Sequence, residues 1–265
     1  MPAAASRQFS NGNSFDRAAQ AAVYRAIFTR RDVRSHFLPD AINDAVLARL
    51  LLAAHHAPSV GYMQPWNFIV IRDDARRRQV RQLFVEARQI EGEQMQGDRH
   101  ALYRSLKLEG ICETPLNLVV TCDRSRAKGS PLGRWHNPQM DLFSTVCAVQ
   151  NFWLAARAEG IGVGWVSILD GDALKRLLDI PDHVVPVAYL CVGHVSGFGS
   201  KPDLETHGWG KRLPLADLVM SEKFAGTGED GLKDAVRAMT STEVLEPAGT
   251  HEQEAVAVAS TIHPA

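Results

Sequence analysis

Cysteine pairs, long apolar runs and a signal-peptide pattern are all missing from this sequence. None of the four cysteines stands in a C-x-x-C pair, so buried free thiols in a reducing compartment are expected. No run approaches the roughly 18 apolar residues of a membrane span. Residues 1–15 also lack the apolar stretch of a signal peptide. We therefore expect a cytoplasmic protein.

An excess of charge of one sign and the common catalytic loops are also missing. Lys and Arg number 29 against 30 Asp and Glu, which gives no reason to expect a nucleic acid or anionic membrane as partner. No G-x-G-x-x-G follows a strand, and neither G-x-x-x-x-G-K-[ST] nor G-x-S-x-G occurs. The histidines have no ligand-like spacing to Cys, Asp or Glu, so no metal is expected. Any anion site must come from a local cluster.

Composition changes at both ends of the chain. Residues 1–14 are small and polar, which predicts a disordered N-terminal arm. Residues 15–219 carry the apolar periodicity of one domain. Residues 220–265 are rich in Glu, Gly, Thr and Ala, which predicts a mostly disordered tail with one weak helix.

Apolar spacing in the central region predicts alternating helices and strands. A first helix begins near Ser14 or Asp16 and runs toward Arg30, and a second is capped by Asn43. Further helices are expected from Asp73 or Asp74 toward Cys112, over 138–159 and over 172–178. The helix at 138–159 is almost wholly apolar and is a candidate for a dimer interface. Buried strands are expected at 67–72, 116–122, 163–168 and 184–195. Strict alternation suggests a parallel sheet, but local patterns do not separate parallel from antiparallel pairing.

The first candidate site is the basic run Arg30-Arg31-Asp32-Val33-Arg34. Arg30 and Arg34 share a face if the helix persists, and arginine forks match phosphate oxygens. A solvated cationic helix end explains such a short run equally simply. Asp32 stands among three cations, which favour its ionised form. It is therefore a structural ion-pair partner or an available base.

The second candidate is the loop P-S-V-G-Y-M-Q-P-W at 58–66. Two prolines and a glycine fix its shape immediately before a buried strand. Its Ser, its Gln and its backbone amides can hydrogen-bond a planar polar ring, and Met63 offers a soft apolar contact. A packed connection with a core tryptophan is the alternative.

Two weaker motifs follow. In G-I-G-V-G-W-V-S-I at 160–168, glycines would let the backbone approach a flat ligand. On its own, this segment is explained as well by a helix stop at Gly160 and a strand that begins at Gly162. Lys211 and Arg212 could complete an anion site or form a charged surface turn.

In order and spacing, these motifs resemble the nitroreductase superfamily of FMN enzymes. Members carry R-R-x-x-R/K, then P-S-x-x-x-x-Q-P-W, then a glycine-rich strand after a long central helix, and a basic residue near the C-terminal end. The resemblance covers about residues 15–219. It implies an α+β fold with a mainly antiparallel central sheet wrapped by helices. It also implies an intertwined homodimer with FMN at the interface.

Within the superfamily, the details resemble one branch. The resembling segments include 57–68, 103–111 and 136–151, together with Asp32 and Ser167. Members of this branch are oxidoreductases that use O2 to fragment reduced FMN (FMNH2). They release 5,6-dimethylbenzimidazole, the lower ligand of cobalamin, and erythrose 4-phosphate. A separate flavin reductase would supply FMNH2, and no metal is implied.

The resemblance also implies residue roles. Asp32 would be a base near the ribityl C1′ and C2′, and Ser167 would orient the reacting edge near N5. Arg30, Lys211 and Arg212 would hold the phosphate, while Ser59, Met63 and Gln64 would come from the partner subunit. The full set implied to bind the flavin is Arg30, Arg31, Asp32, Val33, Arg34, Ser59, Met63, Gln64, Leu108, Ser167, Ile168, Leu169, Lys211 and Arg212.

Two other functions stay open at this point. An ordinary FMN-dependent NAD(P)H nitroreductase or quinone reductase would share the phosphate site and the dimer. A flavin-binding protein without catalysis would need the arginines but no base. Asp32 and Ser167 separate the fragmenting branch from both alternatives.

Overall fold

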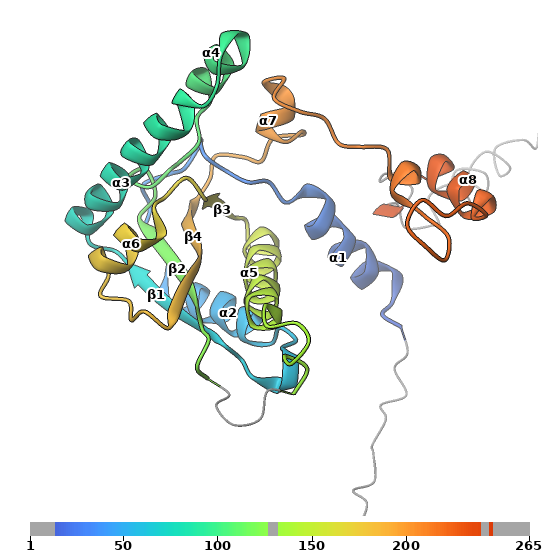
Figure 1. The fold of residues 1–265 in the computed structure, drawn as a ribbon, viewed down its shortest axis with the longest axis horizontal. Coiled ribbons are helices and arrows are strands. Elements are labelled where there is room, and N and C mark those ends of the chain that lie inside the picture. Colours follow the sequence, from blue (N-terminus) through green and yellow to red (C-terminus); the bar gives the residue numbers. More distant parts are fainter. Residues whose placement is uncertain (1–13, 127–131, 240–243, 246–265) are drawn as a thin grey trace, which may run out of the picture. The chain divides into compact units, whose positions relative to one another are not determined.

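The computed structural model of the chain describes residues 14–126, 132–239 and 244–245. Its contacts divide the chain into two units (Figure 1). One unit is Thr29–Arg212, and the other combines residues 1–28 with 213–265. The expected N-terminal arm lies almost wholly outside the described residues, as does most of the chain beyond Met239. The domain boundaries inferred from composition stay predictions.

The larger unit is built on a four-stranded sheet. Its strands are β1 (Trp66–Ile71), β2 (Leu116–Asp123), β3 (Ile161–Val166) and β4 (Val184–His194). The order is β1-β2-β4-β3, and every neighbouring pair is antiparallel. The antiparallel α+β architecture is therefore confirmed. The parallel sheet that strict alternation suggested is wrong, because each strand pairs only with strands that run in the opposite direction. The strands β2 and β3, which α5 connects, run in the same direction, but β4 lies between them.

Helices cover both faces of this sheet. On one face lie α2 (Asp44–His55) and α5 (Met140–Ala158), and on the other α3 (Asp74–Glu93), α4 (Gly97–Ser105) and α6 (Gly171–Leu177). Successive side chains of β4 alternate between the two cores: Leu190 packs toward α5, whereas Tyr189 and Cys191 pack toward α3. Each such buried side chain stabilises the fold by about 1.5–3 kcal/mol.

Local sequence signals set the helix ends in this unit. The side chains of Asn43, Asp73 and Asp170 each accept a backbone N–H from the first turn of the following helix. Each cap contributes about 1 kcal/mol. Gly160 has φ of 74°, a left-handed conformation that stops the helix shortly after the last residue of α5. The short elements η1 (Val60–Tyr62) and α7 (Asp203–Thr206) complete the unit.

The smaller unit contains α1 (Arg17–Thr29), η2 (Leu215–Leu218) and α8 (Asp230–Ala238). Asp16, one of the two residues expected to cap α1, accepts the Ala19 N–H at 2.8 Å. The single helix expected in the tail is α8. No helix in the described part of the chain is both long and apolar enough to cross a bilayer.

All four cysteines are free thiols. Cys122 and Cys191 lie in the core as expected. Cys112, however, is exposed, which corrects the expectation of burial for that residue.

Candidate functional site

The basic run after α1 is not helical. Helix α1 ends at Thr29, and the chain then passes beside β3, where Asp32 and Val163 form an isolated parallel bridge. The Val33 N–H donates to the Val163 carbonyl at 3.0 Å. The helix therefore does not persist to Arg34, and the condition under which Arg30 and Arg34 would share a helix face is not met, because pairing with β3 replaces the helical hydrogen bonds.

Gly164 makes this pairing possible. A Cβ at this position would lie 2.0 Å from the Val33 carbonyl oxygen, a distance that no side chain tolerates. The glycine-rich strand was expected to let the backbone approach a flat ligand. At Gly164 the close approach is instead between two segments of the chain, and it fixes the position of Asp32.

Asp32 is held by two hydrogen bonds. Its Oδ1 accepts the Trp165 N–H at 3.0 Å, and its Oδ2 accepts from Arg34 Nη2 at 2.5 Å. The side chain keeps 30% of its surface exposed, but protein atoms crowd its surroundings. Burial raises the pKa of Asp32 above its ordinary value, and Arg34, the Trp165 amide and Arg30 only partly offset this rise. Arg34 and Arg30 favour the ionised form of Asp32, as expected, but burial outweighs them.

Several arginines gather around Asp32. The Arg30 guanidinium stands 4.7 Å from the centroid of the Trp153 ring. Burial and then the charge of Arg212 lower the pKa of Arg30, although Asp32 opposes them. Burial, Arg30, Arg157 and Arg212 lower the pKa of Arg31. Lys211 is exposed beside Arg212. This concentration of like charge favours binding of an anion with several oxygens.

Arg31 connects this cluster to the C-terminal part of the unit. Its Nε donates to the Gly199 carbonyl at 2.9 Å, and its Nη2 donates to the Ser200 carbonyl at 2.6 Å. Its Nη1 donates to the Arg30 carbonyl at 2.8 Å. These bonds fix the segment that leads into α7. A contact between Arg31 and a ligand stays a prediction.

Arg34 has a donor without an acceptor. Its Nε is buried and has no hydrogen-bond partner among the described residues. A buried polar group left unpaired costs about 1–3 kcal/mol. The site therefore fits a ligand that brings an acceptor to this atom.

Ser167, Ile168 and Leu169 follow β3 immediately. Ser167 is exposed, and its carbonyl accepts the Leu169 N–H at 3.0 Å. Ser167 and Leu169 line a pocket of about 210 Å³ whose wall includes Trp165 and Tyr189. The larger hollows, of about 430 and 550 Å³, lie along α3 and contain none of the predicted site residues. We therefore place the candidate site by its charges.

Leu108 lies in the segment between α4 and β2 and is 9% exposed. It belongs to the same hydrophobic cluster as Ile168 and Leu169, so it supports the base of the Ser167 segment. Leu108 is not part of a helix, because α4 ends at Ser105.

The loop before β1 has a tightly held backbone. The Ser59 Oγ accepts the Gln64 N–H at 3.0 Å, and the Ser144 Oγ of α5 accepts the Val60 N–H at 3.0 Å. Met63 packs inside, with 8% of its surface exposed. The loop is therefore preorganised by its own side chains and by α5.

Two non-glycine residues of this loop have left-handed backbone conformations. Tyr62 has φ of 54° and Gln64 has φ of 50°, while Gly61 between Val60 and Tyr62 has φ of 55°. Each non-glycine residue in this region costs on the order of 1 kcal/mol. Surrounding contacts must offset that cost, and such strain is typical of functional loops.

The loop and the arginine cluster contact different parts of α5. The loop bonds to Ser144, whereas Trp153 lies against Arg30 and its Nε1 donates to the Arg31 carbonyl at 3.2 Å. Nine residues of helix separate the two contacts, which is about 13 Å along the axis. A single copy of the chain therefore does not bring the two halves of the predicted site together.

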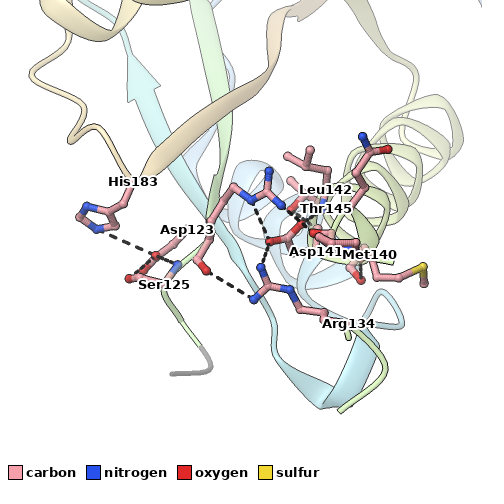
Figure 2. A network of polar contacts seen from close by, with 12 residues as sticks. Asp123, Ser125, Arg134, Met140, Asp141, Leu142, Thr145 and His183 are labelled. Carbon is pink, nitrogen blue, oxygen red and sulfur yellow. Dashed lines mark hydrogen bonds and ion pairs between the residues drawn. The ribbon is translucent and has the colours of Figure 1, made fainter. Parts of the chain in front are cut away.

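A buried ion-pair network lies at the start of α5 (Figure 2). Asp141 is fully buried, and its Oδ2 is 2.8 Å from Arg134 Nη2 and 3.2 Å from Arg124 Nε. Its Oδ1 accepts the Leu142 N–H at 2.8 Å. The network anchors both ends of the connection between β2 and α5 beside the loop.

Comparison with known proteins fits this fold. The model of the nitroreductase family matches residues 27–194. This chain belongs to the nitroreductase family. Among solved structures, iodotyrosine deiodinase bound to FMN and 3-iodo-L-tyrosine superposes with a TM-score of 0.58 at 21% identity. That match covers 68% of this chain and 92% of the other, and at this identity it supports the fold alone.

Two curated relatives of this nitroreductase-family chain share one name. The 5,6-dimethylbenzimidazole synthase of Rhodospirillum rubrum is 43% identical over 185 residues, which cover 70% of this chain and 87% of the relative. The protein of the same name from Rhodobacter capsulatus is 40% identical over 201 residues, which cover 76% of this chain and 97% of the relative.

Sequence reasoning missed several residues around the site. Trp153 and Arg157 are four apart on α5, so their shared face could have been recognised. The Arg157 guanidinium stands 4.1 Å from the centroid of the Phe198 ring, and its Nε donates to the Thr29 carbonyl. Asp203 acts on both Arg31 and Asp32 through its charge, and no local pattern marks it.

Proposed function

We propose that this nitroreductase-family chain is a 5,6-dimethylbenzimidazole synthase. Its substrates would be reduced FMN and O2, and its products would include 5,6-dimethylbenzimidazole and erythrose 4-phosphate. The observation that carries the proposal is the partly buried carboxylate of Asp32, held by two hydrogen bonds among several arginines. The two relatives of that name, at 43% and 40% identity, support the same function.

The residues present fit a flavin mononucleotide. Arg30 and Arg212, with Lys211 beside them, supply the positive charge that the phosphate of FMN requires. The buried Nε of Arg34 lacks an acceptor, and an electron-rich edge of the ligand would supply one. Reduced FMN supplies the electrons and the ring that is fragmented.

Asp32 would act as the general base near the ribityl C1′ and C2′. Its two hydrogen bonds orient the carboxylate, and both donors stabilise the ionised form that accepts a proton. Burial raises its pKa and makes the carboxylate a stronger base at neutral pH than a solvated aspartate. The arginines would therefore bind the substrate and also stabilise the charged form of the Asp32 carboxylate.

Ser167 would orient the reacting edge of the ring. Its hydroxyl lies at the end of β3, three residues after Gly164, and its surface is exposed. A hydroxyl can donate one hydrogen bond and accept others. The backbone of Ile168 and Leu169 would line the same edge, supported from below by Leu108.

A second copy of the chain would complete the site. Apolar side chains remain exposed near the start of α5, including Phe143 at 48% and Trp135 at 81% of their surface, together with Tyr62 at 85%. A homodimer would cover them and bring Ser59, Met63 and Gln64 to the flavin of the other subunit. Closure would also exclude water from the reaction.

The test is to mix the protein with chemically reduced FMN, admit O2 and follow products by chromatography and mass. Release of 5,6-dimethylbenzimidazole in amounts comparable to the FMNH2 consumed is the expected result. Return of intact FMN with hydrogen peroxide would overturn the proposal. NAD(P)H turnover would then separate an ordinary oxidoreductase from a passive flavin binder. A separate reductase would supply FMNH2 in the cell.

A further inference from the structure

Arg126 binds the loop from its C-terminal side. It lies shortly after β2, and its Nη1 donates to the Gln64 carbonyl at 2.7 Å and to the Trp66 carbonyl at 2.8 Å. Its Nη2 donates to the Asn67 side-chain oxygen. One guanidinium therefore fixes the chain on both sides of Pro65.

Asp123 orients this guanidinium. Its Oδ2 lies 3.7 Å from Arg126 Nε, and its Oδ1 accepts the Ser125 N–H and hydroxyl at 2.8 and 2.7 Å. Figure 2 shows Asp123 and Ser125 side by side. Burial alone would raise the pKa of Asp123, but Ser125, Arg126 and His183 together lower it. The carboxylate is therefore charged at neutral pH and holds Arg126 toward the loop.

The loop needs support at this end because its conformation is unfavourable by itself. Tyr62 and Gln64 both have positive φ, and Gln64 carries the carbonyl that Arg126 binds. The other end is fixed separately by the bond between Val60 and Ser144. Loss of Arg126 would therefore free the Met63–Gln64 end of the loop and leave the rest of the fold in place.

We propose that Arg126 is a positioning residue of the reaction: it holds Met63 and Gln64 in the shape that closes the flavin site of the other subunit. The inference rests on the proposed function and deepens it. Arg126 would touch no substrate atom, and it would decide which of two fates reduced flavin meets.

The two fates differ in their products. In the first, FMNH2 transfers two electrons and two protons to O2 and gives FMN and hydrogen peroxide. In the second, O2 is the oxidant and the ring is fragmented, so that 5,6-dimethylbenzimidazole, erythrose 4-phosphate and the remaining fragments of the flavin leave as products. A displaced loop admits water and lets the ring move, and both changes favour the first fate. The ratio of the two products therefore reports the loop position.

The experiment compares Arg126→Ala and Arg126→Lys with the parent protein and with Arg76→Ala. Arg76 is a matched control, since it donates to the Leu177 carbonyl at 2.6 Å between α3 and α6, on the face of the sheet opposite α5, the helix that the loop contacts. Each protein receives the same amount of reduced FMN under O2. The measurements are 5,6-dimethylbenzimidazole and hydrogen peroxide per FMNH2 consumed, affinity for oxidised FMN, and melting temperature.

For Arg126→Ala we expect the ratio of 5,6-dimethylbenzimidazole to peroxide to fall roughly ten- to a hundredfold. FMN affinity should change less than this ratio, because the arginines that would hold the phosphate are untouched. Arg126→Lys keeps the charge beside Asp123 but not the fork, so it should fall between Ala and the parent. Arg76→Ala should keep the parent ratio.

An unchanged product ratio in Arg126→Ala or, should that variant not fold, in a folded Arg126→Lys would overturn the inference and leave the proposed function standing. A fall in melting temperature alone, equal in Arg126→Ala and Arg76→Ala and without a change of ratio, would also overturn it. A parent protein that returns only FMN and peroxide would overturn the proposed function, and the inference with it.

Discussion

The two halves of the predicted site, at different positions along α5, are built on opposite principles. Around Asp32, like charges gather and a buried Arg34 donor lacks an acceptor, so this half is incomplete without a ligand. The loop at 58–66 instead has its backbone held by Ser144 and Arg126 and includes left-handed residues. The first half would bind the ligand and react with it, whereas the second keeps a fixed shape.

The largest expected effect is that of Asp32→Asn, which should reduce 5,6-dimethylbenzimidazole formation by about 10²–10⁴-fold, the usual contribution of a general base. Affinity for FMN should remain close to that of the parent, because the arginines are untouched. Product chromatography and flavin titration measure the two quantities. Asp44→Asn is a suitable control, since Asp44 also pairs with an arginine but lies on α2. Full product formation by Asp32→Asn would contradict the role of Asp32 as general base.

Replacement of Arg30 by Gln should weaken FMN binding by roughly 10- to 100-fold, because charge-assisted hydrogen bonds contribute about 1.5–3 kcal/mol. Riboflavin, which lacks the phosphate, should lose far less affinity. Arg72→Gln provides the control, as Arg72 is an exposed arginine paired with Asp44. Equal losses for FMN and riboflavin would contradict a phosphate site at the cluster.

Ser167→Gly should keep flavin binding but move the products toward hydrogen peroxide, by about tenfold for one lost hydrogen bond in the transition state. The readout is again product per FMNH2. This variant sharpens the comparison, because Ser167 would act on the ring directly while Arg126 acts through the loop. If both variants left the product ratio at the parent value, neither half would control the fate of the flavin.

The smallest effect concerns pH. Because burial raises the pKa of Asp32, and a base works only when ionised, activity should be present above this raised pKa and lost as pH falls through it. The acid limb of the rate profile should therefore lie above the ordinary aspartate value of 3.8. Arg34→Gln removes a charge that lowers the pKa of Asp32, so the limb should move to higher pH. A limb that stays in place or moves down would show that another group controls it.

Much of the fold follows from local patterns. Asn43 begins α2, Gly160 stops the chain after α5, and apolar runs form the four strands within one or two residues of their expected ends. The directions of the strands do not follow from such patterns, because the same alternation of helix and strand is compatible with parallel and antiparallel sheets. The site motifs could be found from the sequence because each is a short contiguous segment.

The sequence by itself determined the residue types available for chemistry and the segments that carry them: three arginines and an aspartate in 30–34, and the loop at 58–66. Only the tertiary structure decided that the chain leaves the helix before Arg30 and that Asp32 pairs with β3. It also placed the charge of Asp203 near Arg31 and Asp32, and the guanidinium of Arg126 on the carbonyls of the loop. It also decided the direction of the pKa of Asp32. The physical reason is that burial and electric field at a side chain are set by distant parts of the chain, which no local spacing records.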